Sequence, residues 1–188
     1  MVREIVCDTS AIITLFLSCY LSGNEDEYRH ELGQYRLIAS NLVYSELKDF
    51  AVQDDDLALS AQESLSYNMD FLSVELEDIE QYKKILGVVG RRGITDCDIS
   101  GLYLSFDRNA PFFIDDFKAQ FHFSSFFDDR DIFFGVLLVC SILAEFMGEK
   151  EVFSFIFDKL VPNRWANISL RNLLTIKHAV SEYLTYYS

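Results

Sequence analysis

The chain has 188 residues, half of them hydrophobic, and carries a formal net charge of −14. Such a chain can bury one sizeable core, and no Gly-, Ser- or Pro-rich linker demands a second domain. The negative charge argues against a protein that binds nucleic acid through its overall field, because phosphate binding relies on Lys and Arg, but it is compatible with a cation site or a basic partner.

The first predicted strand ends at an acidic residue. Arg3–Cys7 favours a strand, and apolar residues at helical spacing follow over Ile12–Tyr20. This helix falls short of the roughly 20 apolar residues of a membrane span, and with Asp8 before it and no basic n-region it is not a signal peptide. Asp8 is an acid at a strand's carboxyl end. Capping of the helix by Asp8, Thr9 or Ser10 is the structural alternative.

The next strand and helix repeat this arrangement. Arg36–Ala39 predicts a strand, and Ser40 or Asn41 caps a helix whose apolar residues run from Leu42 to Phe50. Glu46 lies on this helix between apolar neighbours, where an isolated acid is more often a surface residue at the edge of the apolar stripe.

Three further elements lead to the middle of the chain. The pattern predicts a helix over 57–65, a third strand over 71–74 and a helix over 77–86. Arg91 and Arg92, the only adjacent arginine pair in the sequence, then offer a local phosphate contact, with a solvated loop as the alternative.

A capped helix comes next. Thr95 or Asp96 can cap it, and apolar residues recur at i, i+3, i+4 and i+7 from Ile99 to Phe106, which is the stripe that buries one helix face. Asp98 therefore lies in the first turn of this helix.

A short buried strand over Phe112–Ile114 stops at two adjacent acids, Asp115 and Asp116. A helix over Phe117–Phe123 follows, in which Lys118 is the cation nearest to the acid pair in the sequence. Because ligands bind at the carboxyl ends of strands in open α/β sheets, we expect this pair at a functional edge.

The last third of the chain is helical. It predicts helices over Ile132–Met147, Glu149–Leu160 and Ser169–Tyr186, the first of them apolar on more than one face. Together with the alternating strands and helices before it, this predicts one compact α/β unit, residues 1–130, with a mainly parallel sheet, and a helical extension, residues 131–188, on the same core. An apolar strip left exposed on the extension would favour a homodimer or a protein partner.

Several kinds of chemistry find no support in the sequence. No His neighbours a nucleophile, there is no Gly-rich phosphate loop, and the four cysteines lack zinc spacing, so they fit small buried side chains in a reducing cytoplasm. What remains is a set of acids that would repel one another unless a divalent cation or protons neutralised them. Hard oxygen ligands suit Mg²⁺ or Mn²⁺. The acids are Asp8, Glu46, Asp96, Asp98, Asp115 and Asp116.

Four acidic motifs follow one another in a fixed order. They are Asp8-Thr9-Ser10 after the first strand, Tyr44-Ser45-Glu46-Leu47 in a helix, Asp98-Ile99-Ser100-Gly101-Leu102 at a helix start, and Ile114-Asp115-Asp116 after a strand. In this order and spacing they resemble the PIN-domain family of metal-dependent ribonucleases. The segment from Phe112 to Leu170 also resembles the C-terminal half of prokaryotic PIN-like proteins.

This resemblance implies an α/β/α sandwich with parallel strand order 3-2-1-4-5 and endonucleolytic cleavage of RNA in the cytoplasm. It also implies one or two Mg²⁺ or Mn²⁺ ions that activate water and stabilise the charge of the scissile phosphate. An antitoxin or another protein partner and a homodimer fit the same family. The implied roles are Asp8, Glu46, Asp98 and either Asp115 or Asp116 as catalytic metal ligands, Asp96 as helix cap or additional ligand, Ser10 as a support or substrate contact, and Arg91, Arg92 and Lys118 as substrate contacts.

Two other functions remain open at this point. A PIN-like interaction protein without catalysis would keep the fold, and metal-dependent cleavage of RNA would separate it from a nuclease. A phosphotransfer enzyme with Asp8 as nucleophile would need a second acid two positions later, where Ser10 stands.

Overall fold

The computed structural model describes residues 3–53, 55–89, 93–127 and 132–186. In chain order the elements are β1 (Arg3–Cys7), α1 (Thr9–Ser22), α2 (Glu25–Leu32), β2 (Tyr35–Ser40), α3 (Asn41–Ala51), α4 (Asp56–Ser66), β3 (Asp70–Leu72), α5 (Leu76–Ile85), α6 (Asp96–Arg108), β4 (Phe112–Phe113), α7 (Phe117–Phe123), β5 (Ile132–Phe133), α8 (Gly135–Ala144), α9 (Glu149–Ser154), the π-helix η1 (Phe155–Leu160), α10 (Val161–Arg164) and α11 (Leu170–Tyr186).

The described strands form one parallel sheet in the order β3-β2-β1-β4-β5. This confirms the predicted α/β fold, its strand order and its helical C-terminal part. β1 lies at the centre, where Cys7 pairs with Phe113 of β4 and Ile5 pairs with Leu37 of β2. The residues that follow β1 and β4 therefore emerge side by side at the carboxyl edge of the sheet.

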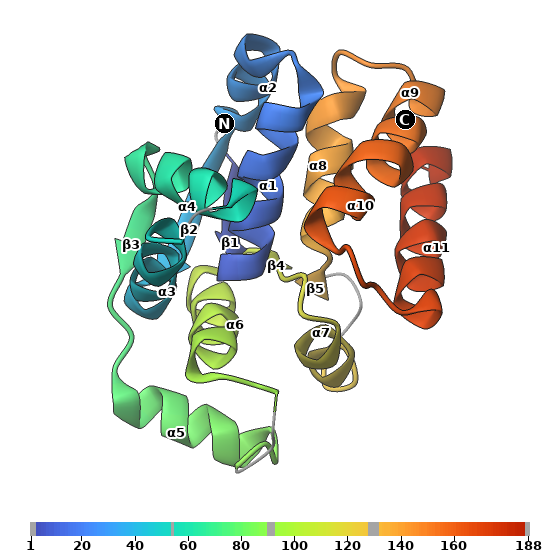
Figure 1. The fold of residues 1–188 in the computed structure, drawn as a ribbon. Helices are drawn as coiled ribbons and strands as arrows, with labels where there is room; N and C mark the ends of the chain where they lie inside the picture. Colours follow the sequence, from blue (N-terminus) through green and yellow to red (C-terminus); the bar gives the residue numbers. More distant parts are fainter. Residues whose placement is uncertain (1–2, 54, 90–92, 128–131, 187–188) are drawn as a thin grey trace.

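The two faces of the sheet bury separate apolar cores because successive strand residues point to opposite sides. Ile5 and Cys7 of β1 belong to the core that α1, α4, α8 and the C-terminal helices cover. Val6 and Phe112 belong to the other core, which α5, α6 and α7 cover. In Figure 1, α1 runs in front of the sheet, with the C-terminal helices beside it and α5 and α6 below.

Helix α1 is buried over almost its whole length, which explains its nearly continuous apolar sequence. Its residues from Ala11 to Cys19 are all buried, and α4 and α8 pack against it. Complete burial of a Leu or Phe side chain contributes about 1.5–3 kcal/mol, so residues such as Leu15 and Phe16 fix the position of this helix, and with it the turn that precedes it.

The predicted helix over 132–147 is wrong at its start. Ile132 and Phe133 form β5 and pair with Phe112 and Phe113, and α8 begins only at Gly135. The fifth strand thus lies beyond residue 130, so part of the predicted extension completes the sheet. Apolar β-favouring residues directly before an apolar helix leave no change of pattern that would mark the boundary.

The apolar faces of α8 are largely covered within the chain. Val136, Val139, Cys140 and Leu143 are buried, and α8 packs against α1 and α11. In the described part of the chain, no helix has the length and apolar character needed to cross a membrane.

Candidate functional site

The turn between β1 and α1 carries the first predicted acid. The Asp8 N–H donates to the Phe113 carbonyl at 3.1 Å, so Asp8 still follows the sheet register when the chain turns. Its Oδ1 accepts from the Ala11 N–H at 2.7 Å, which makes Asp8 the N-cap of α1. The Ser10 hydroxyl lies 3.0 Å from Oδ1 and 2.8 Å from Oδ2 and donates to this carboxylate.

Ser10 also joins this turn to the end of β4. Its Oγ accepts from the Asp115 N–H at 2.9 Å. The Asp115 side chain is 4% exposed, and neither of its carboxylate oxygens has a hydrogen-bond partner among the described residues. A Cβ added at Gly135 would lie 2.7 Å from Asp115 Oδ2, so the carboxylate rests against the first residue of α8. Ser10 is therefore a structural support of two acids.

Asp98 is held at the start of α6 by a reciprocal pair of hydrogen bonds with Thr95. The Thr95 N–H and hydroxyl donate to Asp98 Oδ2 at 2.6 and 2.8 Å, and Thr95 Oγ1 accepts from the Asp98 N–H at 3.2 Å. This is a capping box with Thr95 as N-cap. In the described structure both bonds to the Asp98 carboxylate fall on Oδ2, which leaves Oδ1 of this buried carboxylate for another ligand.

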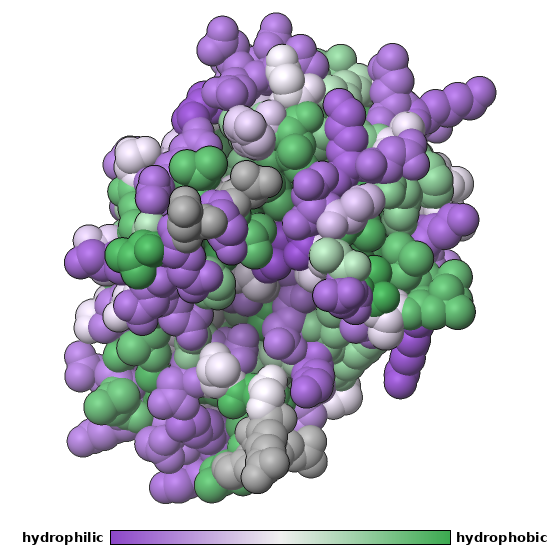
Figure 2. Space-filling model, in the orientation of Figure 1, coloured by the Kyte–Doolittle hydropathy of each residue, from purple (hydrophilic) through white to green (hydrophobic). Residues whose placement is uncertain are grey.

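Glu46 approaches the same region from α3. Its Oε2 accepts from the Thr9 hydroxyl at 2.6 Å, and Thr9 Oγ1 lies 3.7 Å from the Sγ of Cys97 at the start of α6. Thr9 thus connects the starts of α1 and α6 to the partly buried Glu46. In Figure 2, hydrophilic residues lie in the middle of the visible face, where the start of α1 stands in Figure 1.

These acids act on one another electrostatically. Burial raises the pKa of Asp8 well above its ordinary value, and the negative charges of Asp98 and Asp115 raise it further, against hydrogen bonds that lower it. The charge of Asp8 therefore interacts with the charges of both Asp98 and Asp115.

The pKa of Asp98 rises to about 6, mainly through burial and then through the charges of Asp116 and Glu46, although the Thr95 donors lower it. These links join Asp8, Asp98, Asp115, Glu46 and Asp116 into one group, the carboxylate cluster.

The environment of Asp115 differs from that of the other acids. Burial raises its pKa, whereas the Thr14 hydroxyl, the positive charge of Arg164 and the N–H groups of Val136 and Gly135 lower it. These donors surround the carboxylate without meeting hydrogen-bond geometry. Asp115 is therefore influenced by partial and full positive charges, and its own negative charge acts on Asp8.

The next residue, Asp116, has a different structural role. Asp116 is partly buried and caps α7, with its Oδ1 accepting from the N–H groups of Lys118 and Ala119 at 2.8 and 2.9 Å. Asp115 is thus the buried member of the pair. The exposed Lys118 side chain packs near Gly93, where an added Cβ would lie 3.1 Å from its Cδ.

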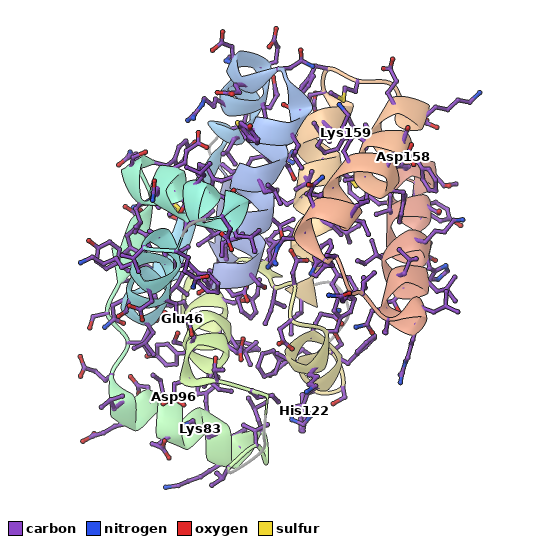
Figure 3. The ribbon with its side chains drawn as sticks, in the orientation of Figure 1. Glu46, Lys83, Asp96, His122, Asp158 and Lys159 are labelled. Atoms are coloured by element: carbon purple, nitrogen blue, oxygen red, sulfur yellow. The ribbon has the colours of Figure 1, made fainter. Side chains whose placement is uncertain are left out.

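Asp96 lies apart from these acids. It is exposed and pairs with Lys83 of α5 at 2.5 Å, while Thr95 caps α6. Figure 3 shows Lys83 and Asp96 together at the lower end of the view, with Glu46 above them on α3. The predicted phosphate contacts Arg91 and Arg92 lie outside the described residues.

Arg164 is a site residue that the sequence reasoning missed. Its Nε donates to Thr14 Oγ1 at 3.1 Å and its Nη2 to the Ser10 carbonyl at 3.4 Å. Burial lowers the pKa of Arg164, while the charges of Asp115 and Asp8 oppose this shift. No local pattern links Arg164 with residues 150 or more positions earlier in the chain.

The acidic side chains of the site are the type of ligand that a hard divalent cation prefers, because they offer carboxylate oxygens. Buried Asp115 in addition has no hydrogen-bond partner for either oxygen in the described structure. As placed, however, no three acidic, histidine or cysteine side chains of the described residues are arranged to hold a metal ion. Searches of family models, of curated proteins and of solved structures gave no match to this chain. A function for this chain is therefore inferred from the chemistry of the site.

Proposed function

We propose that this chain is a Mg²⁺- or Mn²⁺-dependent endoribonuclease of the PIN type. The observation that carries the proposal is the burial of Asp8, Asp98 and Asp115 at one edge of the sheet, with both Asp115 oxygens unpartnered in the described structure. Buried carboxylates that raise one another's pKa are costly, and a divalent cation would offset that cost.

The chain's own residues would hold and orient this cation. Ser10 fixes the Asp8 carboxylate and Thr95 fixes Asp98, so two ligands come from rigid helix starts. Glu46 has three rotatable side-chain bonds, so its carboxylate would be able to turn away from Thr9 toward a bound cation. A cation bound there supplies Lewis-acid activation of water and charge stabilisation at a phosphodiester.

The spacing of the acids is the point on which this proposal is tested. Among the described residues no three acidic, histidine or cysteine side chains are arranged to hold a metal ion, so cation binding would require Glu46 or Asp115 to move toward Asp8 and Asp98. Asp115 is then the ligand of the adjacent pair, because Asp116 is engaged in capping α7.

A second candidate function is a PIN-like interaction module without catalysis. It is favoured by Thr9 and Thr95, whose hydroxyls already satisfy one oxygen each of Glu46 and Asp98. In that case the acids would serve as helix caps, and RNA would remain intact in the presence of metal.

The experiment is a cleavage assay on metal-free protein with a random-sequence single-stranded RNA pool, with and without added Mn²⁺. Asp98→Asn protein, purified in parallel, controls for contaminating nucleases. We expect Mn²⁺-dependent endonucleolytic products from the natural chain alone. Intact RNA at protein excess, together with no measurable Mn²⁺ binding, would reject the nuclease and favour the interaction module.

Protein association is a separate proposal. The side chains of Leu170 and Leu174 on α11 are 71% and 55% exposed, and they support a homodimer or a partner such as an antitoxin. Light scattering at tens of micromolar would test the dimer, and a monomer would contradict it.

A further inference from the structure

A cavity of about 710 Å³ lies between the sheet and two of the C-terminal helices, α8 and α11. Its lining includes Arg3 and Tyr35, the first residues of β1 and β2, and Pro111, which directly precedes β4. The cavity therefore extends to the amino edge of the sheet, whereas the carboxylate cluster lies at the carboxyl edge. We call it the amino-edge cavity. In Figure 1, α8 and α11 run beside each other on one side of the sheet.

The two helices face the amino-edge cavity with small side chains among larger ones. On α11, Ala179 and Tyr183 line it at a spacing of i, i+4, and on α8, Leu137 and Ser141 do so at the same spacing, so each pair shares one helix face. Protein interiors normally leave few voids larger than a water molecule, because side chains interdigitate. Ala179 and Ser141 are too small to fill the space between the helices and the sheet. The space that remains has the size of small-molecule sites, which is about 300–1,000 Å³.

The sheet side of the cavity is aromatic. Phe113 of β4 and Phe133 of β5 line it, with their ring centroids 5.5 Å apart and their planes inclined by 30°. Tyr35 of β2 and Tyr183 of α11 add two further rings to the lining. Aromatic rings pair in offset-stacked or edge-to-face arrangements, which add to the effect of burying apolar area. A flat aromatic ligand therefore suits these walls better than a saturated one.

A group of three hydroxyls adds a polar point to these walls. The Tyr35 hydroxyl and the Ser141 Oγ lie 3.0 Å apart in a hydrogen bond. Burial raises the pKa of the Tyr183 phenol, against a hydrogen bond with Ser141 that lowers it, so Tyr183 is neutral at pH 7 and joins the same group. Because a hydroxyl both donates and accepts, this group can take up one further hydroxyl from a ligand.

The charged residues of the lining do not favour an anion. Glu4 forms an ion pair with Arg36 at 2.6 Å, and the other charged side chains of the described lining, Arg3 and Glu182, have opposite signs. The chain as a whole carries a net charge of −14, which repels anions further. A neutral ligand avoids the cost of placing an unpaired charge in a largely apolar space.

We propose that the amino-edge cavity binds a neutral aromatic molecule that carries a hydroxyl group, with its rings against Phe113 and Phe133 and its hydroxyl at Tyr35 and Ser141. Burial of the rings drives binding, and the hydroxyl fixes the orientation of the ligand. This site goes beyond the proposed metal-dependent function and does not depend on it, because the described lining contains none of the acids of the carboxylate cluster.

The test is equilibrium dialysis of the full chain at pH 7 against 2-naphthol, naphthalene, 2-naphthoate and decahydro-2-naphthol, which share one bicyclic skeleton. We expect 2-naphthol to bind at one site per chain, about two- to tenfold more tightly than naphthalene, which is the range that one net neutral hydrogen bond gives. The anionic 2-naphthoate and the saturated decahydro-2-naphthol should both bind more weakly than 2-naphthol.

Variants locate the binding. Ala179→Phe places a ring in the cavity and should abolish binding of 2-naphthol and naphthalene. The double variant Tyr35→Phe/Ser141→Ala should lower the affinity for 2-naphthol to that for naphthalene and leave naphthalene binding unchanged, a difference that a general loss of structure would not produce. Leu174→Ala removes an exposed apolar side chain of α11 outside the described lining and should bind every probe as the natural chain does. Melting curves establish that each variant is folded.

The outcomes decide for or against this site alone. Absence of binding of every probe near its solubility limit, 2-naphthoate or decahydro-2-naphthol as the tightest ligand, or equal losses in Ala179→Phe and Leu174→Ala would overturn the proposal. RNA cleavage plays no part in these measurements, so a failure of the proposed nuclease function would leave them unchanged. Should Ala179→Phe fail to fold, the comparison of 2-naphthol with naphthalene on the natural chain and on the double variant decides the question.

Discussion

Replacing Asp98 by Asn should stabilise the metal-free protein at neutral and alkaline pH. Both Thr95 donors bind the same carboxylate oxygen, Oδ2, so the single carbonyl oxygen of an Asn can replace it in the capping box. The new amide group carries no charge for Asp116 and Glu46 to repel. The substitution therefore removes a repelling charge and keeps the cap.

The magnitude follows from the pKa of Asp98. That pKa rises from 3.8 to about 6 in the folded chain, and each unit corresponds to about 1.36 kcal/mol of differential stability. Because the folded state binds the proton more tightly, the natural chain loses stability as pH rises from about 4 through about 6, by about 3 kcal/mol in total. Allowing for the weaker cap of a neutral acceptor, we expect a gain of about 2 kcal/mol for Asp98→Asn above pH 7.

Urea denaturation in EDTA at pH 4, 6 and 8 measures this difference in unfolding free energy. The gain should be close to zero at pH 4 and reach its plateau by pH 8. Asp49→Asn, which removes an exposed charge from α3, is the matched control and should show no such pH dependence. An Asp98→Asn protein that is less stable than the natural chain at pH 8, or that gains equally at all pH values, would refute the electrostatic reasoning.

The remaining predictions concern neighbours of the cluster. Asp8→Asn should abolish Mn²⁺-dependent cleavage of RNA yet fold normally or with greater stability in EDTA, because Asn caps helices as well as Asp does; loss of folding in circular dichroism would instead favour a purely structural cap. Glu46→Gln should weaken Mn²⁺ binding in titration calorimetry by about tenfold or more with little change in the urea midpoint in EDTA, and unchanged affinity would remove Glu46 from the ligand set. Gly135→Ala should cost about 1–3 kcal/mol in urea denaturation, because its Cβ would lie 2.7 Å from the Asp115 Oδ2 and 2.8 Å from the Ala11 Cβ; an unchanged midpoint would show that this contact can relax.

The sequence was sufficient for the first four strands and for the acids at strand ends, whereas the residues of β5 were predicted as helix. Arg3–Cys7 and Phe112–Phe113 are short apolar or β-favouring runs followed directly by acids, and parallel pairing of β1 with β4 then brings Asp8 and Asp115 to one edge. The strand order came from the resemblance rather than from the periodicity, because pairing partners of parallel strands leave no local mark.

Other parts of the site depend on contacts that no local pattern contains. The sequence could not tell which of Asp115 and Asp116 is the buried acid. In the structure Asp116 caps α7, whereas the start of α8, which follows β5, lies against Asp115. The β5 strand could not be predicted because it lies in a continuous apolar run that leads into a helix. Arg164 reaches the cluster only because η1 and α10 fold back onto the first turns of α1.

The helix-cap role and the proposed metal-site role of these acids are compatible, because the backbone N–H groups of each cap engage one carboxylate oxygen. Asp8 caps α1 through Oδ1, Asp98 accepts from Thr95 through Oδ2, and Asp116 caps α7 through Oδ1. A cap fixes one carboxylate oxygen against the helix start and thereby restricts the direction of the other. An acid at an element end is therefore already oriented before a ligand arrives, and the same hydrogen bond satisfies an N–H group of the helix start that has no partner within the helix.

Asp115 is the exception that distinguishes the two interpretations. It caps no helix, is buried, and has neither oxygen hydrogen-bonded within the described structure. A carboxylate with only a structural role would gain stability from satisfying those oxygens, since unpartnered buried acceptors cost about 1–3 kcal/mol each. The partial positive charge of the α8 start and the full charge of Arg164 reduce that cost without saturating the carboxylate. Asp115 thus remains available to a ligand, as a site residue requires and a cap does not.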